Sequence, residues 1–446
     1  MIEQQYIDLF QQHRAEIDSN SIEILNQQRD AAFETFKNIG FPTSKIEEYI
    51  HSDISLAFDR ELGLNIHNLA IPVNPYDTFK CDVPNLETNL HFIVNDRYYK
   101  NENQEKGLPD GVFAGGMRDF AAQYPEIFKE HYGQSADYSD NGVAAYNTMF
   151  APDGFVLYVP KNVVVDKPIQ LINILRGDVD LNVNRRLLII GEDGARVKLL
   201  VCDHALSDVH FVATQVTEIF AGEESDIDFY ELEENSVKVT RLSSLFTAQK
   251  GRSHVIASNI ALHNGFTRNN YRFRLLGEYA QATIGGLAIC DKTQHVDNYA
   301  FLDHVMPNCT SNELFKYVLQ EQSTGVFCGK ILVEKDAQKT LAYQTNRNLV
   351  ASPEARMYAK PQLEIYADDV KCSHGLTTGH LDEEAQFYLQ ARGIPEKEAK
   401  MLLMVAFTKD VLDLINIESL KERLEYLIDK RFRGELMRCG NCEVCK

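Results

Sequence analysis

Apolar residues recur at helical spacing at both ends of the chain and at strand spacing between them. The first forty residues predict two helices, the second starting after Ser21 as its N-cap and ending at Gly40. Short alternating apolar segments separated by polar turns then fill Gly154–Val370, which is typical of many short strands. After Gly375 the spacing becomes helical again. The pattern therefore predicts a helical region, a long β region and a second helical region.

Turn signals and apolar spacing predict three helices after Gly375. The first ends at Gly393, and the second begins at Pro395, a residue that is tolerated in the first turn of a helix. The third covers residues 418–432. Its apolar face carries leucine and isoleucine at helical spacing: Leu420, Leu424, Leu427 and Ile428.

The strand region repeats with a step near 29 residues. A small residue followed by a strand recurs at intervals of 30, 28 and 29 residues, in Ala195–Val197, Ser225–Ile227, Ser253–Val255 and Ala282–Ile284. A constant step of this length is typical of stacked coils, because each coil buries its apolar side only against the next one. A β-sandwich also has many short strands, but its turns fall about every 8 to 12 residues. We therefore predict a mainly β fold built on a β-solenoid.

These changes of pattern divide the 446 residues into four regions. The second region contains turn signals such as Pro109-Asp110-Gly111 but permits few assignments. The regions are an N-terminal helical region (1–65), a mixed connecting region (66–153), the solenoid core (154–375) and a C-terminal helical region with a cysteine-rich tail (376–446).

Charge and composition narrow the classes of function. The net charge of −20 repels phosphate backbones and anionic lipid headgroups, so we expect neither nucleic acid nor a membrane as a partner. The N-terminus lacks the basic flank and apolar stretch of a signal peptide, and the longest apolar run, Met401–Phe407, is too short to span a bilayer. A cytoplasmic location is expected. Six of the nine cysteines are scattered, which argues against a disulfide framework.

A thiol and an imidazole lie two residues apart in Cys372-Ser373-His374. On a strand, such a pair projects to one face, where the two groups could share a soft or borderline metal. Spacing alone favours a structural role at the end of a strand, because two protein ligands leave a metal half-coordinated. A functional role therefore requires further ligands from elsewhere.

Three more thiols crowd into the C-terminus at a spacing that suits zinc or an iron-sulfur cluster: Cys439, Cys442 and Cys445. The alternative is a frayed tail with reactive thiols.

The helix at Met401–Phe407 is apolar all round, which fits either core or a docking surface with adaptable methionines. The run Gly325–Ile331 resembles a phosphate loop, but it has one residue too few between its glycines and no hydroxyl after Lys330. We expect no nucleotide there.

The chain resembles the SufB and SufD family of the SUF iron-sulfur cluster assembly system in three segments: "NCTSNELFKYVL", "STGVFCGKILVEKDAQKTLAYQTNRNLV" and "KPQLEIYADDVKCSHGLTTGHLDEEAQFYLQARGI". The resemblance is almost continuous from about Asn308 to Leu412. Upstream, "FPTSKIEEY" is also similar, with Tyr49 in place of the usual tryptophan. The chain is most similar to the SufD branch, because SufB members carry a cysteine motif in a longer N-terminal region and here the first cysteine is the isolated Cys81.

The resemblance implies a right-handed parallel β-helix between helical ends, with two partners. A SufB-like paralogue would pair β-helix to β-helix, and a SufC-like ABC-type ATPase would bind the helices after Gly375. In the family the nascent cluster forms at the heterodimer interface, so the resemblance makes His374, with Cys372 beside it, a ligand for a transient iron-sulfur cluster or iron. The missing ligands would then come from the partner, and the isolated chain would hold no tightly bound cofactor.

The function expected is therefore that of a non-enzymatic assembly scaffold, with ATP hydrolysed by a partner. A stand-alone β-solenoid enzyme or carbohydrate-binding protein is the alternative, and it would need acids or aromatics clustered along one face. A self-sufficient iron or sulfur carrier would rest on the cysteine tail, for which the resemblance offers no role. Homodimerisation of the isolated chain stays open.

Overall fold

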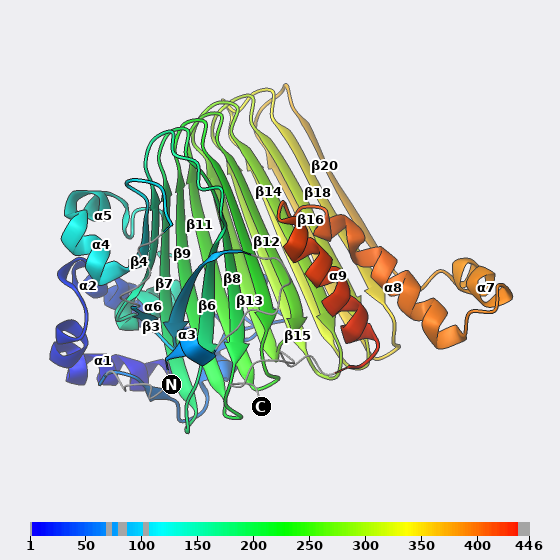
Figure 1. Cartoon of the computed structure of the whole chain (residues 1–446), viewed down its shortest axis with the longest axis horizontal. Coiled ribbons are helices and arrows are strands. Elements are labelled where there is room, and N and C mark those ends of the chain that lie inside the picture. Colours follow the sequence, from blue (N-terminus) through cyan, green and yellow to red (C-terminus); the bar gives the residue numbers. More distant parts are fainter. Residues whose placement is uncertain (1, 68–73, 79–86, 101–106, 436–446) are drawn as a thin grey trace.

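The computed structural model describes residues 2–67, 74–78, 87–100 and 107–435. Its central body is a parallel β-solenoid of about eight turns, each of which contributes one strand to each of two facing sheets. Helices lie at the N-terminal end of the solenoid and against its C-terminal half (Figure 1). The predicted mainly β class, with a β-solenoid between helical ends, is confirmed.

Two ten-stranded sheets, here named sheet A and sheet B, form the walls. Sheet A contains β4 (Phe113–Gly116), β5 (Gly154–Val159), β7 (Leu181–Gly191), β9 (Phe211–Ala221), β11 (Val239–Gln249), β13 (Phe266–Leu275), β15 (His295–His304), β17 (Thr324–Val333) and β19 (Arg356–Ile365), with β1 (Gly63–Leu64) paired to β7. Sheet B contains β2 (Asn89–Val94), β3 (Arg97–Tyr99), β6 (Ile169–Leu175), β8 (Arg196–Ala205), β10 (Asp226–Glu234), β12 (His254–His263), β14 (Gln281–Cys290), β16 (Thr310–Leu319), β18 (Leu341–Val350) and β20 (Lys371–Gly379).

Successive coils stack almost in register, so that each inward position continues as a column along the solenoid. In sheet B, one such column contains the buried residues Leu199, Phe229, Ala257 and Ile284. Each coil covers the apolar side of the coil before it, which is why the strands are nearly continuous in buried residues. The last coil, β19 and β20, has no coil beyond it, and this end of the solenoid is open (Figure 1).

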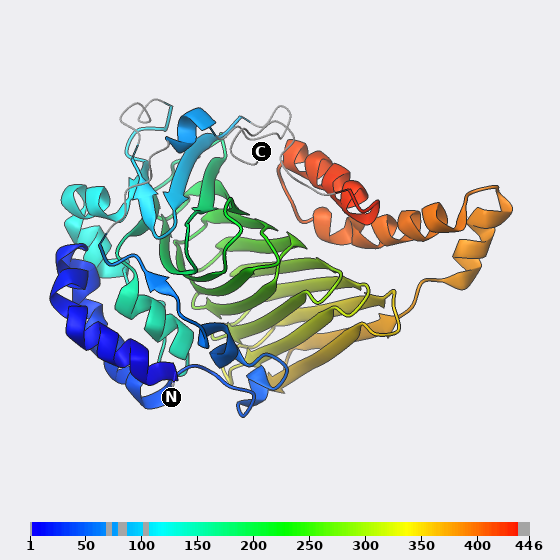
Figure 2. The same cartoon turned by 90° about the horizontal axis from the view of Figure 1, so that it is seen from below.

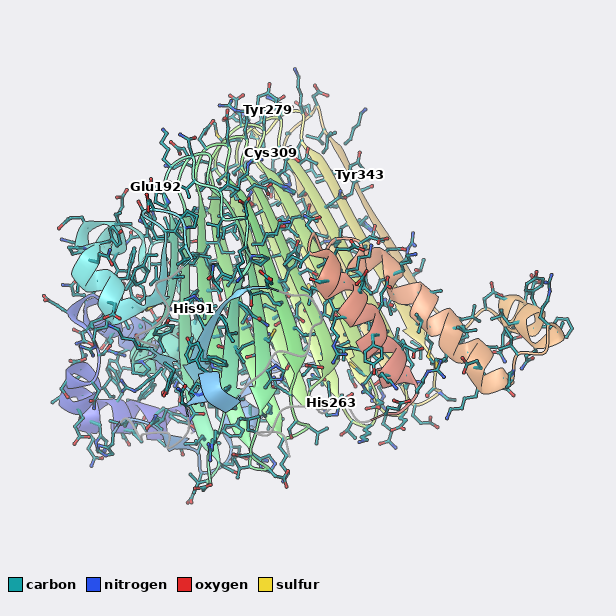
Figure 3. The ribbon with its side chains drawn as sticks, in the orientation of Figure 1. His91, Glu192, His263, Tyr279, Cys309 and Tyr343 are labelled. Atoms are coloured by element: carbon teal, nitrogen blue, oxygen red, sulfur yellow. The ribbon has the colours of Figure 1, made fainter. Side chains whose placement is uncertain are left out.

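A left-handed backbone residue recurs at the same turn of successive coils. Seven residues share a positive φ at this edge: Asn162, Gly194, Glu224, Arg252, Tyr279, Asn308 and Lys339. Glu192, Tyr279 and Cys309 mark the edge in Figure 3. A non-glycine residue in this conformation is uncommon, so its repetition shows that one turn geometry is reused from coil to coil.

N-terminal helices cover the outer face of sheet A. They are α1 (Ile2–Ser19), α2 (Glu23–Ile39), α4 (Met117–Gln123), α5 (Pro125–His131) and α6 (Gly142–Phe150), with the short helices η1 (Glu47–Tyr49), η2 (Ile54–Phe58) and α3 (Pro75–Thr78) in the connections. Aromatic side chains of the helices, such as Tyr6 and Phe36, pack in one cluster with Val212 and Leu242 of the sheet.

Three helices follow the solenoid, and the second and third of them pack on the outer face of sheet B (Figure 2). They are α7 (Glu383–Ala391), α8 (Glu396–Leu412) and α9 (Glu418–Phe432). The predicted apolar face of the third helix is confirmed, because its leucines and Ile428 are buried against the sheet. None of the helices in the described ranges is long and apolar enough to span a membrane.

Two local predictions are wrong. The N-cap of α2 is Ile22, which makes no side-chain capping bond, so Ser21 lies one residue too early. The fourth repeat of the strand start is Ala280, because Ser253 precedes β12 as Ala280 precedes β14 and the strands pair as His254 with Gln281. The predicted position, Ala282, is two residues late. A shift of two residues keeps every side chain on the same face of a strand, so the apolar pattern cannot detect it.

Candidate functional site

Cys372 and His374 lie in β20, the edge strand of sheet B at the open end of the solenoid. The prediction that they end a strand is wrong. The apolar run before them belongs to β19 in sheet A, and a turn at residues 366–370 separates the two strands. No alternation of apolar and polar residues marks β20, because almost all of its residues are exposed.

The register of β20 places both side chains on its inward face. Cys372 pairs with Ala342 and His374 pairs with Gln344, and both partners on β18 are buried between the sheets. Cys372 packs partly against the internal apolar core, whereas His374 is exposed. The predicted shared face is therefore confirmed. That face is the inner wall of the solenoid at the end where the interior meets solvent.

The two groups cannot by themselves complete a metal site. Burial raises the pKa of the Cys372 thiol, so the thiol stays protonated at neutral pH and a metal would have to displace its proton. Among the residues that the structure describes, no group of three or more histidine, cysteine or acidic side chains is arranged to hold a metal ion. A tetrahedral metal needs four ligands, which leaves this pair incomplete within that part of the chain.

The methionines of the Met401–Phe407 run are core residues. Met401 and Met404 of α8 are buried against Val318 and Leu349 on the outer face of sheet B. The exposed apolar surface lies instead on α7, where Phe387 and Tyr388 are 71% and 57% exposed. Helix α7 has no buried residue and stands away from the solenoid (Figures 1 and 2).

Two family models match the chain. The model described as "SUF system FeS cluster assembly, SufBD core domain" matches residues 174–407, and the model of the "SufBD protein N-terminal region" matches residues 1–171. The chain belongs to the SufBD family. It is thus an iron-sulfur cluster assembly protein of the SUF system, and Cys372 and His374 fall within the matched core domain.

Similar proteins bear SufD and SufBD names. An iron-sulfur cluster assembly SufBD family protein of Synechocystis is 27% identical over 419 residues, which are 92% of this chain and 91% of that protein. The iron-sulfur cluster assembly protein SufD of Bacillus subtilis is 25% identical over 363 residues, 79% of this chain and 81% of that protein. Escherichia coli SufD is 38% identical over 167 residues, 37% of this chain and 40% of that protein. Within the family, the chain is SufD-like.

The cysteine tail of this SufBD protein lies outside the described residues, so the prediction for Cys439, Cys442 and Cys445 stays a prediction. The described cysteines are free thiols: Cys202, Cys290, Cys309, Cys328 and Cys372. Burial raises the pKa of Cys328 to about 11 and that of Cys290 to about 12, so neither is a reactive thiolate.

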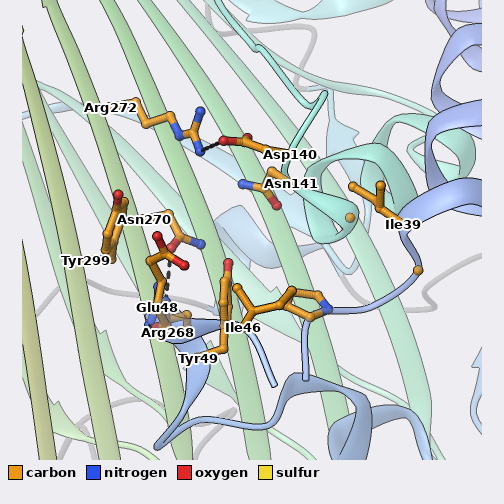
Figure 4. Close-up of a pocket in the computed structure, with 13 residues that line it drawn as sticks. Ile39, Ile46, Glu48, Tyr49, Asp140, Asn141, Arg268, Asn270, Arg272 and Tyr299 are labelled. Atoms are coloured by element: carbon orange, nitrogen blue, oxygen red, sulfur yellow. Dashed lines mark hydrogen bonds and ion pairs between the residues drawn. The ribbon is translucent and has the colours of Figure 1, made fainter. Parts of the chain in front are cut away.

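A pocket of about 330 Å³ lies between the N-terminal segment and the outer face of sheet A (Figure 4). Arg268 is its buried cation, and it is already paired with Asp297. Its guanidinium also lies 4.2 Å from the ring centroid of Tyr49, and its Nη1 donates to the carbonyl of Glu48 at 2.9 Å. The charge of Arg268 is therefore used to hold the segment that contains "FPTSKIEEY" against the sheet.

Charged side chains also gather inside the first half of the solenoid. Asp203 accepts hydrogen bonds from Arg185 and Arg241, each at 2.8 Å, and Arg241 is also paired with Glu231. All four are at most 3% exposed. Such a cluster presents no face to a glycan, and its acids are matched by arginines. It gives no support to the alternative of a carbohydrate-active solenoid.

Sequence reasoning missed the polar residues that lie beneath His374 on the inner wall. Gln344 and Glu313 precede it by 30 and 61 positions, and only the register of the coils brings them into one column. The sequence held one signal for them. Glu313 and Gln344 are polar, whereas the matching positions of earlier coils carry apolar residues.

Proposed function

We propose that this chain is a scaffold subunit of a SUF assembly complex and is not itself an enzyme. A SufB-like chain covers the open end of the solenoid, and a SufC-like ATPase binds the helices after Gly375. His374, with Cys372 beside it, supplies ligands to iron or to a forming cluster, which is the cargo of the complex. The partner supplies the remaining ligands, and the site works in the cytoplasm.

The observation that carries this proposal is the position of the Cys372 and His374 pair. A thiol and an imidazole share the inner wall at the open end of the solenoid, and they lack further ligands in the described residues. The edge strands β19 and β20 also leave backbone hydrogen-bonding groups for another chain to cover. An incomplete metal site at an unpaired edge is what an interface between two chains would complete.

Replacement of His374 tests the ligand role. The variant His374→Ala is co-expressed with a SufB-like chain and a SufC-like ATPase and purified without oxygen. We expect most of the iron and of the visible cluster absorbance to be lost, while the three subunits still co-purify. The control is Ser373→Ala, because Ser373 lies on the same strand and faces outward. Cluster loading by His374→Ala at the wild-type level would contradict the proposal.

Helix α7 supports the second partner. Its aromatic residues Phe387 and Tyr388 are exposed without a covering element in the described chain, as expected of a docking surface. Tyr388→Ala should weaken co-purification of the ATPase and leave the SufB-like chain bound. Tyr426→Ala on α9 is the control, since Tyr426 is 50% exposed on a neighbouring helix. Wild-type co-purification of the ATPase with Tyr388→Ala would rule out docking through this face of α7.

The role of the cysteine tail is tested by truncation after Gly434. We expect iron content of the complex to stay unchanged, because the proposed site does not use the tail. A large loss of iron on truncation would favour the carrier function instead.

A further inference from the structure

One column of the inner wall changes from apolar to polar at the open end of the solenoid. The sheet B column that holds Leu199, Phe229, Ala257 and Ile284 continues through Glu313 on β16 and Gln344 on β18 to His374 on β20. Glu313 and Gln344 are 2% and 1% exposed, so they lie as deep as the apolar residues before them. Burying a polar side chain without hydrogen-bonding partners costs free energy. Buried polar groups are therefore usually hydrogen-bonded, and these two residues should have partners.

Glu313 fixes one end of the Gln344 amide. The Nε2 atom of Gln344 donates to Oε2 of Glu313 at 3.1 Å. Burial raises the pKa of Glu313 to about 8, so this carboxyl group is mostly neutral at neutral pH and binds the amide without placing a charge in the core. The Oε1 atom of Gln344 is buried and has no hydrogen-bond partner in the described chain. This oxygen can therefore accept a hydrogen bond from a neighbouring donor.

Gly329 on the opposite sheet makes room for this amide. A Cβ atom at Gly329 would lie 2.2 Å from Nε2 and 2.7 Å from Cδ of Gln344, which is closer than such atoms approach. Gly329 belongs to β17, so the run Gly325–Ile331 that resembles a phosphate loop is a strand. Its second glycine leaves space for the Gln344 side chain.

We propose that Gln344 is a positioning residue for His374: its Oε1 accepts the ring N–H of His374 and leaves the other ring nitrogen free for the metal. Neighbouring strands lie about 4.8 Å apart, so side chains paired across β18 and β20 are within reach of each other. Histidines that bind metals usually donate their second ring N–H to a carbonyl or carboxylate, which fixes the tautomer and the ring orientation. That this hydrogen bond prepares His374 for a metal rests on the proposed function, but the hydrogen bond itself does not.

The test measures the tautomer of His374 in the isolated full chain by nitrogen NMR with labelled histidine. The His374 signal is assigned from its loss in His374→Gln, and spectra are recorded about two pH units above the ordinary histidine range, where the ring is neutral. Gln344→Met removes the acceptor and keeps an unbranched side chain of similar length. We expect the ratio of the two tautomers to change by about fivefold, the factor expected of one net hydrogen bond.

Two further variants separate positioning from general damage to the fold. Gln344→Glu keeps an acceptor at the same place and should retain the wild-type ratio. Gly329→Ala displaces the amide while leaving Gln344 present, and should shift the ratio as Gln344→Met does. An unchanged ratio in both Gln344→Met and Gly329→Ala would overturn the proposal.

Cluster loading in the co-expressed complex distinguishes this inference from the proposed function. If the tautomer shifts in Gln344→Met but His374→Ala loads normally, the positioning contact stands and the ligand role of His374 fails. If His374→Ala loses the cluster and Gln344→Met changes neither tautomer nor loading, the ligand role stands and the positioning role fails. When both hold, Gln344→Met should weaken iron binding by about tenfold.

Discussion

Glu313 shows what it costs to bury one carboxyl group between the sheets without a charged partner. Its pKa is raised by burial from 4.5 to about 8, because the charged form is poorly solvated between the sheets. The folded chain therefore favours the neutral form of Glu313 over the ionised form. Its contribution to stability is therefore fully present below about pH 4.5 and is lost as the pH rises through about 8.

Glu313→Gln should remove this part of the pH dependence. Since glutamine does not ionise, the apparent Tm of the variant relative to wild type should rise between about pH 5 and pH 8. The measurement is thermal unfolding of the isolated chain across this range. Glu278→Gln serves as the control, because Glu278 is exposed in a turn. Parallel curves for wild type and Glu313→Gln would show that Glu313 titrates in the same range in the folded and unfolded chain.

Helix α8 shows how one element divides between core and surface. Met404 is 5% exposed against sheet B, while Leu402, two residues earlier, is 39% exposed. Two residues correspond to about 200° around a helix, which places the two side chains on opposite sides. The all-apolar sequence of this turn therefore combines a buried stripe with an exposed one.

Met404→Ala should lower the free energy of unfolding by about 2 to 5 kcal/mol, the usual cost of a core truncation that leaves a cavity. Leu402→Ala should change it by no more than about 0.5 kcal/mol. Urea unfolding followed by circular dichroism measures both. If Leu402→Ala destabilised the chain as much as Met404→Ala, the orientation of α8 on sheet B would be wrong.

At the scale of the whole molecule, the N-terminal segment connects coils of sheet A that do not contact one another. This segment runs along the outer face of sheet A and reaches the last coil, where His51 stacks on Tyr358 with ring centroids 3.6 Å apart and Glu47 pairs with Lys360. Two coils earlier, on β15, Ser52 contacts His295 at 2.9 Å through a hydrogen bond. Coils of a solenoid contact only their neighbours. The N-terminal segment (residues 41–58) therefore adds contacts that stabilise the end coil, which carries the proposed site.

Tyr358→Ala should lower the local stability of both the N-terminal segment and the last coil. Hydrogen exchange should become several-fold faster in residues 41–58 and in β19, roughly in proportion to the local stability that is lost, with little change in the early coils. Tyr343→Ala is the matched aromatic control, because Tyr343 is exposed on sheet B (Figure 3), whereas the N-terminal segment lies on sheet A. Unchanged exchange in residues 41–58 of Tyr358→Ala would show that the stacking does not hold the segment.

The open end also predicts the behaviour of the chain without its partner. Edge strands pair readily with other strands, so the isolated chain should form a dimer at high concentration in sedimentation experiments. Thr377→Lys on β20 should reduce this association, because a lysine on an edge strand disfavours pairing. Val237→Lys, in an exposed turn, is the control. A wild-type chain that stays monomeric at every concentration would contradict this prediction.

Short-range sequence signals determined the local elements. The third C-terminal helix was predicted over its observed range, because leucines at helical spacing and the flanking turn residues are read within a few positions. The shared face of Cys372 and His374 follows in the same way from the alternation of a strand, once the strand is known. The stacking of coils was visible in the repeat, although its register was wrong by two residues at Ala282.

Only the tertiary structure decided what surrounds these elements. Gln344 and Gly329 are 15 residues apart in the chain and lie on opposite sheets, yet their side chain and backbone share one space beneath His374. No local pattern encodes that meeting, because it depends on the register of each coil on the next. The sequence by itself determined which residues form coils and helices, and coil stacking decided that the thiol and imidazole lie on the inner wall at an open end.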